Sequence, residues 1–239
     1  MTRPMAAVAV PPEATPDVVA GIDLGSNSFH MIVVRAQKDG RVHILDRIKE
    51  PVRLADGLTK GRELDGDAQA RGLDALNRFS QRLASFPRAS VRAVGTNTLR
   101  MAKNGPEFLL RARESLGHDI DIISGPEEAR LIYLGVSHSS WFPGPRLVMD
   151  VGGGSTELIV GEGYTADLRD SLFMGCVSYS KRFFERGRLR EEGFDAAEVA
   201  AKLELRGIAK RYQAHGWERA TGASGTLKAI DTVIREEGW

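Results

Sequence analysis

The stretch Arg146-Leu-Val-Met-Asp150-Val-Gly-Gly-Gly-Ser155-Thr-Glu157-Leu-Ile-Val160 decides the fold of this chain. Two apolar runs flank three consecutive glycines, which is the pattern of a β-hairpin with a polar turn. Glycines leave backbone N–H groups uncovered by side chains, so phosphate oxygens can approach them closely. Asp150 and Glu157, on either side of the turn, carry the hard oxygen ligands that Mg²⁺ prefers. The stretch therefore predicts either a phosphate-binding turn with metal ligands beside it or a plain tight hairpin.

A less regular copy of this pattern lies near the start of the chain. Residues 18–22 are apolar and lead into Asp23-Leu-Gly-Ser26-Asn27-Ser28, and residues 29–34 are again mostly apolar. Both copies have the order strand, Asp-x-Gly, small polar residues, strand. The repetition indicates an internal duplication, with two similar domains that present phosphate-binding turns to each other across a cleft. The added candidates are Asp23 for metal binding and Ser26, Asn27 and Ser28 for phosphate binding.

The composition is that of an ordinary globular protein. The chain has 239 residues, 27% of them charged and 42% hydrophobic, with a net charge of +1. That length allows two domains of modest size. Because no long basic tract is present, nothing in the sequence calls for a nucleic-acid partner, and a polyanionic substrate must be met by local arginines and loop amides.

The cysteine content and the N-terminal segment indicate in which compartment the protein is expected. Cys176 is the one cysteine, which excludes an intramolecular disulfide and any multi-cysteine metal site, and we expect a buried structural thiol. Residues 1–17 are rich in Ala and Pro and are predicted to form a disordered tail. Pro11 and Pro12 interrupt its apolar patch before it reaches the length of a signal segment. We therefore expect a cytoplasmic protein without stable membrane insertion.

The first half of the chain alternates strands and helices. A strand is expected at 42–45, a helix at 67–86 and a buried strand at 91–94. This last strand leads into a loop at 95–100 that carries short polar side chains and a guanidinium. Arg100 suits a phosphate because its fork donates parallel hydrogen bonds, although an ion pair on a helix surface is an alternative. The candidate phosphate ligands of this loop are Thr96, Asn97 and Arg100.

A pair of acids follows where a further strand is expected to end. A helix at 106–116 and a strand at 120–123 lead to Ser124-Gly-Pro126-Glu127-Glu128. Proline at the first helical position and acids in the first turn are favourable at a helix start, which explains these residues without any function. This helix start nevertheless lies at the C-terminal end of a strand, where α/β sheets usually bind ligands. One of the two glutamates is therefore a candidate base.

The second half repeats the alternation. We expect a strand at 168–174, helices at 177–184 and 194–212, a strand at 217–221 and a last helix at 227–236. Between the last strand and the last helix lies Gly222-Ala-Ser-Gly225-Thr226, where small residues form either an anion nest or a simple helix cap. Gly225 and Thr226 are the candidate phosphate ligands here.

Taken together, these motifs resemble the exopolyphosphatase/guanosine-pentaphosphate phosphatase family of the actin-like ATPase superfamily. The resemblance covers residues 20–236 and follows the family's motif order. It implies an α/β fold of two ribonuclease-H-like (actin-like) domains around a central cleft, at 18–144 and 145–239, with the second incomplete at its C-terminal end because family members are longer. The motifs are Asp23-Leu-Gly-Ser-Asn-Ser28, Gly95-Thr-Asn-Thr-Leu-Arg100, Ser124-Gly-Pro-Glu-Glu-Ala-Arg130, Asp150-Val-Gly-Gly-Gly-Ser-Thr-Glu157, Met174-Gly-Cys-Val-Ser178 and Gly222-Ala-Ser-Gly-Thr226.

The resemblance also implies roles for individual residues. The family's catalytic glutamate corresponds to Glu128, which precedes Asp150 by 22 residues, rather than to Glu127. Asp150 and Glu157, helped by Asp23, match the acids associated with Mg²⁺ or Mn²⁺. The predicted substrate-binding residues are Ser26, Asn27, Ser28, Thr96, Asn97, Arg100, Gly152, Gly153, Gly154, Ser155, Gly225 and Thr226.

Within this family the triplet Gly152-Gly-Gly154 favours an exopolyphosphatase, which releases orthophosphate from the end of inorganic polyphosphate. The alternative is a guanosine pentaphosphate 5′-phosphohydrolase with the same machinery. A small-molecule kinase is disfavoured because no Walker A lysine motif is present. A catalytically weak module that binds polyphosphate or nucleotide is a further alternative, against which the four acids argue. The expected partners are polyphosphate or guanosine pentaphosphate, with a homodimer as a further candidate.

Overall fold

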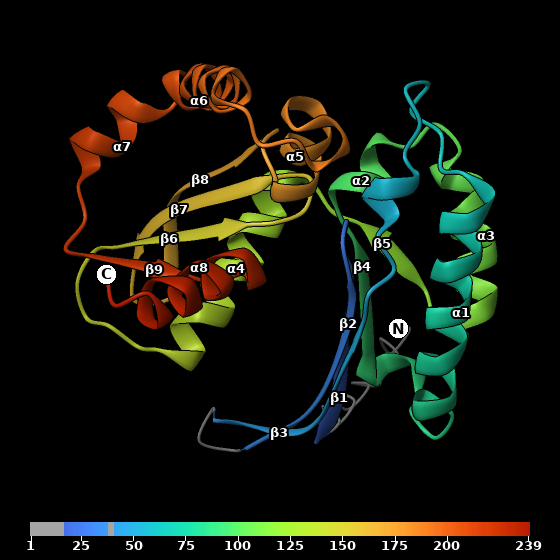
Figure 1. The fold of residues 1–239 in the computed structure, drawn as a ribbon. Coiled ribbons are helices and arrows are strands. Elements are labelled where there is room, and N and C mark those ends of the chain that lie inside the picture. The colour runs from blue at the N-terminus through green and yellow to red at the C-terminus, as the bar shows by residue number, and fades with distance from the viewer. Residues whose placement is uncertain (1–16, 38–40) are drawn as a thin grey trace, which may run out of the picture.

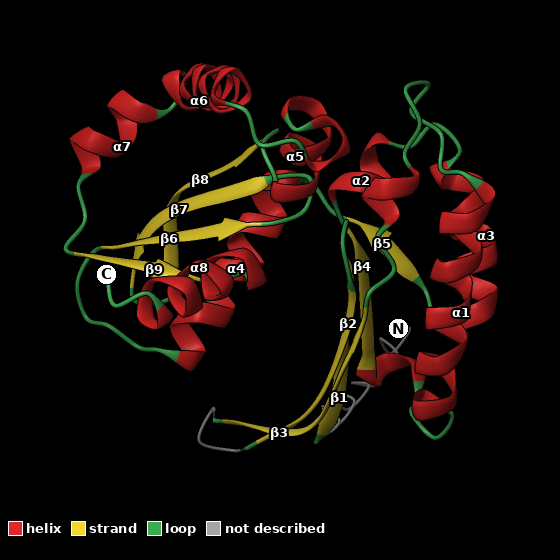
Figure 2. Ribbon diagram, viewed as in Figure 1, coloured by secondary structure: helices red, strands yellow, loops and turns green. Residues whose placement is uncertain are grey.

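The computed structural model describes residues 17–37 and 41–239 and contains two β-sheets with helices around them (Figures 1 and 2). The strands are β1 (Val18–Leu24), β2 (Phe29–Ala36), β3 (Val42–Glu50), β4 (Val91–Gly95), β5 (Ile120–Ile122), β6 (Arg146–Val151), β7 (Thr156–Glu162), β8 (Thr165–Leu172) and β9 (Arg219–Gly222). The helices are α1 (Gly66–Leu83), α2 (Asn97–Met101), α3 (Gly105–Leu116), α4 (Gly125–Ser139), α5 (Cys176–Phe183), α6 (Glu191–Arg206), α7 (Ala209–His215) and α8 (Gly225–Glu236). Short 3₁₀ helices are η1 (Leu54–Gly57), η2 (Arg88–Ser90) and η3 (Glu185–Gly187).

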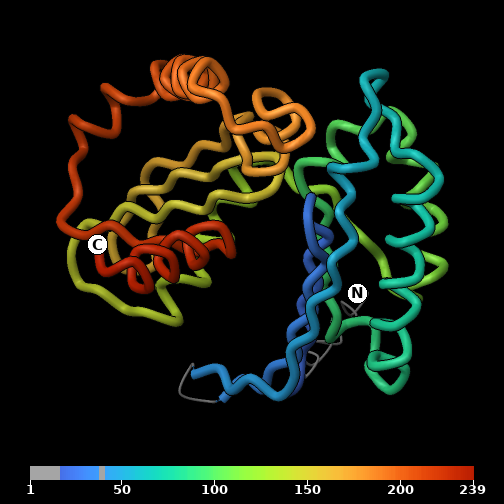
Figure 3. Tube along the Cα trace, in the orientation of Figure 1, coloured from blue at the N-terminus to red at the C-terminus, as the bar shows by residue number. Residues whose placement is uncertain are grey.

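The two sheets share one topology. The first has the order β3-β2-β1-β4-β5 and the second has the order β8-β7-β6-β9. In the first sheet β1 pairs antiparallel with β2 and parallel with β4, and in the second sheet β6 pairs in the same way with β7 and β9. The chain completes the first sheet before it enters the second (Figure 3). The topology therefore repeats as the duplicated sequence pattern predicts.

The first sheet is held by a continuous apolar core. α1 starts at Asp65, whose carboxylate accepts a hydrogen bond of 2.7 Å from the Ala68 N–H, a standard N-cap. Its buried face includes Leu76 and Phe79, which pack with Phe108 of α3 under the sheet. Apolar residues at helical spacing thus turn toward the strands and fix β1, which leads to the first glycine turn, and β4, which leads to α2.

The second sheet is covered on both faces, since successive residues of β7 point in opposite directions. Ile159 packs with Tyr133 of α4. Leu158 and Val160 pack instead with Tyr212 of α7. Although the sequence division at 144/145 assigns α4 to the first domain, α4 packs chiefly against β7 and β8. The division at 144/145 stays a prediction.

Several local expectations need correction. The predicted loop at 95–100 contains helix α2, which is too short to show a periodic pattern and is anchored by buried Leu99. The single helix expected at 194–212 is two helices, because α6 ends before Gly207 and Ile208 then turns into the core. Cys176 is half-buried rather than buried.

The expected tail at 1–17 lies outside the described residues except for Asp17, whose carbonyl accepts a hydrogen bond of 2.9 Å from the Ala36 N–H. Among the described residues, no helix combines the length and apolar character needed to cross a bilayer.

We expect Tyr212→Phe to lower the free energy of unfolding by about 1 to 2 kcal/mol, measured by urea denaturation. The buried Tyr212 hydroxyl lies 2.6 Å from the Leu158 carbonyl oxygen and 2.8 Å from Asp170 Oδ2, and its removal breaks both contacts, although Arg211 still donates to Asp170. Tyr179→Phe is the matched control, because the buried Tyr179 hydroxyl has no hydrogen-bond partner among the described residues and its loss should cost nothing. Equal stability of the two variants would contradict this account.

Candidate active site

Two glycine turns of the same shape stand at the ends of β1 and β6. Each contains four residues, 25–28 and 152–155, between a strand that carries an aspartate and its antiparallel partner. A Cβ atom on Gly25 would lie 2.8 Å from the Ser28 carbonyl oxygen, and one on Gly152 would lie 3.1 Å from the Ser155 carbonyl oxygen. The backbone folds back so closely at both positions that any side chain would crowd the turn.

The tips of the two turns contact each other where the two sheets approach. A Cβ atom on Gly153 would lie 3.2 Å from Asn27 Cβ and 3.4 Å from the Asn27 backbone nitrogen. One on Gly154 would lie 2.5 Å from Asn97 Nδ2 and 3.2 Å from Ser26 Oγ. The structure therefore brings the predicted phosphate ligands of both halves to a single place.

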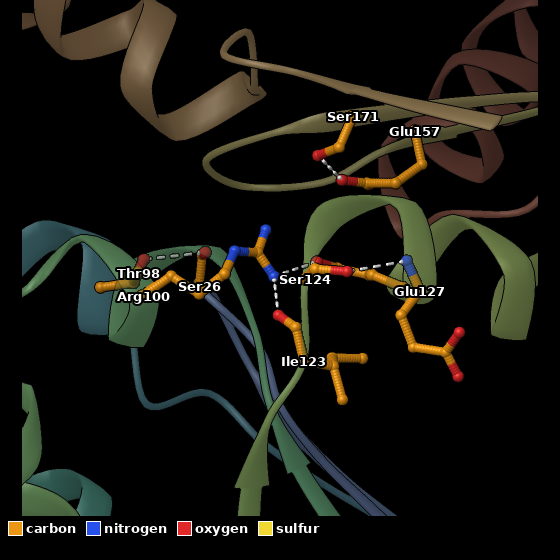
Figure 4. Close-up of polar contacts among 9 residues, drawn as sticks. Ser26, Thr98, Arg100, Ile123, Ser124, Glu127, Glu157 and Ser171 are labelled. Atoms are coloured by element: carbon orange, nitrogen blue, oxygen red, sulfur yellow. Dashed lines mark hydrogen bonds and ion pairs between the residues drawn. The ribbon is translucent and has the colours of Figure 1, made fainter.

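Helix α2 adds buried polar groups to the first turn. Thr98 Oγ1 donates a hydrogen bond of 2.8 Å to Ser26 Oγ, a contact that Figure 4 shows. Thr96 and Asn97 are buried beside it, and Asn97 Oδ1 has no hydrogen-bond partner in the described structure. Thr98 is a residue that the sequence analysis did not select, since its role depends on the helix that places it over Ser26.

Three acids border the turns. Asp23 is the last residue but one of β1, and Asp150 faces Glu157 directly in the register of β6 and β7. Burial, together with the charges of Glu128 and Asp150, raises the pKa of Asp23 to about 7. The same causes act on the other two carboxyls: burial and Glu128 raise the pKa of Asp150 to about 6 and that of Glu157 to about 7. Four carboxyl groups therefore lie close enough to repel one another.

Glu128 belongs to this group, whereas Glu127 does not. Arg100 Nη1 lies 2.9 Å from Glu128 Oε2 and also donates a bond of 2.7 Å to the Ile123 carbonyl. Burial raises the pKa of Glu128, although Arg100 opposes the rise. The Glu127 carboxylate points away from Arg100 in Figure 4 and forms a 2.7 Å ion pair with Arg130. Arg100 thus forms an ion pair at this site, with the predicted base as its partner.

Two further elements complete the surroundings. Ser171 of β8 donates a hydrogen bond of 2.7 Å to Glu157 Oε1 (Figure 4). The sequence pattern did not indicate Ser171, because only the pairing of β7 with β8 places the two residues opposite each other. Ser224 caps α8 and accepts a bond of 3.2 Å from the Val151 N–H. This bond ties the second turn to the segment that contains Gly225 and Thr226.

The acids suit a cation that keeps some of its waters. No group of three or more His, Cys, Asp or Glu side chains within residues 17–37 and 41–239 converges closely enough to form a complete metal cage. Mg²⁺ is commonly held by one or two carboxylates together with waters and substrate phosphates, so a complete cage is not required. Asp23 Oδ1 is buried and has no hydrogen-bond partner within the part of the chain that the structure describes, which leaves an oxygen available to such a cation. The residues present therefore fit Mg²⁺ or Mn²⁺.

Comparison with known proteins gives the family. The model of the Ppx/GppA phosphatase family matches residues 33–238. The chain belongs to the Ppx/GppA phosphatase family. A relative from Aliivibrio fischeri, named guanosine-5′-triphosphate,3′-diphosphate pyrophosphatase, is 47% identical over 93% of this chain. The chain spans 45% of that relative's length.

Solved Ppx/GppA structures share the fold. An exopolyphosphatase from Cytophaga hutchinsonii is 27% identical with a TM-score of 0.83, over 92% of this chain and 71% of that chain. The Aquifex aeolicus Ppx/GppA enzyme is 30% identical with a TM-score of 0.69, over 86% of this chain and 67% of that chain. These likenesses confirm the α/β fold with two actin-like units. The Aliivibrio fischeri relative is named for a guanosine substrate, whereas the Cytophaga hutchinsonii structure is that of an exopolyphosphatase.

We expect Gly154→Ala to lower kcat/KM for phosphate release roughly tenfold to a hundredfold, because the new methyl group displaces Asn97 or Ser26 and separates the turns. The control is Gly207→Ala, where no atom lies within 4 Å of the added Cβ. Its activity should stay within about twofold of the parent, as for most surface substitutions. Full activity in Gly154→Ala would show that the contact between the turns is dispensable.

Proposed function

We propose that this chain carries the reaction centre of a phosphohydrolase that removes the terminal phosphate from the 5′-triphosphate of guanosine pentaphosphate. The observation that carries the proposal is the meeting of two glycine turns and four acids at one place in a Ppx/GppA family chain. The name of the 47% identical Aliivibrio fischeri relative supports the guanosine substrate.

The reaction is an in-line displacement at the terminal phosphorus. A water oxygen forms the new P–O bond while the bridging P–O bond breaks, which yields orthophosphate and a product shortened by one phosphate. Glu128 accepts the proton of the attacking water, and Arg100, 2.9 Å from its Oε2, fixes the orientation of the carboxylate. Partial burial keeps the carboxylate away from bulk solvent and raises its pKa. Glu128 is therefore a stronger base than a fully solvated glutamate.

The two turns supply donors for the phosphate oxygens. Backbone N–H groups at 25–28 and 153–155, together with the hydroxyls of Ser26, Ser28 and Ser155, line the meeting point of the sheets, whereas the Gly152 N–H donates to the Ser155 carbonyl. Both hydrogen bonds that the Arg100 guanidinium donates within the described residues use Nη1, so its Nε and Nη2 groups remain available to a phosphate. Positioning and charge stabilisation of this kind provide most of the catalysis in phosphoryl transfer.

The charge balance of the site calls for a cation. Four carboxyl groups face one guanidinium, so a polyphosphate group entering alone meets net repulsion. Asp23, Asp150 and Glu157 would hold Mg²⁺ or Mn²⁺. When bound, the ion neutralises charge on the phosphoryl oxygens.

Inorganic polyphosphate is the second candidate substrate. The Gly152-Gly-Gly154 triplet and the solved Cytophaga hutchinsonii exopolyphosphatase favour it. Parallel assays of orthophosphate release from guanosine pentaphosphate, GTP and long-chain polyphosphate in Mg²⁺ distinguish the two. The proposal predicts the highest kcat/KM for guanosine pentaphosphate. A higher kcat/KM for polyphosphate would instead support exopolyphosphatase activity. Substrate binding without phosphate release would support a binding module.

Glu128→Gln should lower kcat by about a hundredfold to ten-thousandfold, because the amide cannot accept the proton of the water. The adjacent Glu127→Gln provides the matched control, since its carboxylate is paired with Arg130 outside the site. We expect the control to retain activity within about twofold. Steady-state phosphate release from both variants, with circular dichroism to verify folding, tests the assignment. Parental turnover in Glu128→Gln would refute it.

Asp150→Asn should raise the Mg²⁺ concentration needed for half-maximal activity by roughly tenfold or more, because a neutral amide is a weaker ligand than a carboxylate. Calorimetric Mg²⁺ titration should show the same loss of affinity without turnover. Asp195→Asn, on the exposed surface of α6, is the control. A Mg²⁺ titration unchanged from the parent would exclude a metal role for Asp150.

A further inference from the structure

A lysine outside the site described above connects the two halves of the molecule. Lys181 lies on α5 of the second unit, and its Nζ donates to the carbonyl oxygens of Ala55 at 2.8 Å and Asp56 at 2.7 Å. Asp56 Oδ1 lies 3.3 Å from the same nitrogen. The three N–H donors of an ammonium group thus have three acceptors, all on η1 of the first unit. We call this set of contacts the Lys181 tie.

The acceptor end of the Lys181 tie is bonded to the first glycine turn. The Ala55 N–H donates to the Ser26 carbonyl at 2.9 Å, and the Arg53 N–H donates to the Asn27 carbonyl at 2.7 Å. Arg53 adopts a left-handed conformation with φ of 54°, which is unfavourable for a non-glycine residue and persists only where surrounding contacts hold it. Leu54 is fully buried in the first core. η1 is therefore a platform that backbone hydrogen bonds join to the first turn.

The other end of α5 is bonded to the second glycine turn. The N–H group of Cys176 donates to the Gly152 carbonyl at 2.9 Å, and that of Val177 donates to the Gly153 carbonyl at 2.9 Å. A Cβ atom on Gly175 would lie 2.6 Å from the backbone of Gly153, so this packing is close. Helix α5 begins at one turn and, through Lys181, reaches the platform of the other (Figure 1).

We infer that Lys181 is a positioning residue that holds the two glycine turns at the spacing required to bind the substrate phosphates. This inference rests on the proposed function. Both partners of the ion pair are nearly half exposed, at 45% and 43% for the side chains of Lys181 and Asp56, so the tie is weak enough to break and re-form. Without it, the substrate must first bring the turns together, which reduces its apparent affinity by the fraction of molecules in the competent arrangement.

The test is Lys181→Met, which keeps an unbranched apolar side chain and removes the donors. We expect KM to rise roughly threefold to tenfold while kcat at saturation stays within about twofold, since bound substrate restores the arrangement. Lys181→Arg, which can still donate to the same carbonyls, should return KM to within about twofold of the parent. Lys210→Met, on α7, is the matched control and should leave both constants unchanged. An unchanged KM in Lys181→Met, or a fall in kcat alone, would overturn the inference.

A readout independent of turnover separates this inference from the proposed function. Hydrogen exchange at the Arg53 and Ala55 amides should be faster in Lys181→Met than in Lys210→Met, because loss of the tie loosens the platform. If the parent chain releases no phosphate from any substrate, the proposed function fails and this comparison alone decides the inference. Equal exchange rates in the two variants would reject the role of Lys181.

Discussion

The close approach of the two glycine turns is the constraint on which the rest of the structure depends. A side chain at Gly153 or Gly154 would enter the space of Asn27 or Asn97, so the sheets meet at this edge only because both positions lack a Cβ atom. The apolar core beside each sheet supports this approach, because it holds in place the strands that flank the two turns. Backbone amides of both halves are thereby concentrated at one place, as phosphate binding requires.

The second consequence of this approach is electrostatic. It gathers Asp23, Asp150, Glu157 and Glu128 into one partly buried group. Burial raises the pKa of each carboxyl, and repulsion from neighbouring carboxylates raises the pKa of Asp23, Asp150 and Glu157 further. Repulsion among buried carboxylates disfavours folding unless a positive charge offsets it. In the function we propose, a cation bound with a polyphosphate group would satisfy the acids, and the position of Glu128 beside Arg100 would leave it free to act on water rather than on the metal.

Much of this organisation could be predicted from the sequence, because glycine turns between apolar strands and the spacing of their acids are local signals. Contacts that depend on pairing could not be predicted. Ser171 meets Glu157 only through the register of β7 and β8, and Thr98 meets Ser26 only because the expected loop is helix α2. Lys181 is one exposed lysine among many in the sequence, and only the packing of α5 against η1 distinguishes it. The choice of substrate stays a proposal, since the glycine triplet predicts polyphosphate whereas the name of the Aliivibrio fischeri relative supports the guanosine pentaphosphate proposed above.

The most direct test of the account is a crystal structure of this chain with Mn²⁺ and a non-hydrolysable triphosphate, with anomalous scattering used to locate the metal. The account predicts a terminal phosphate within hydrogen-bond distance of both turns, 25–28 and 152–155, with the metal beside Asp150 and with Glu128 facing the phosphorus. A terminal phosphate held by one turn alone, or bound at a distance from Glu128, would contradict it.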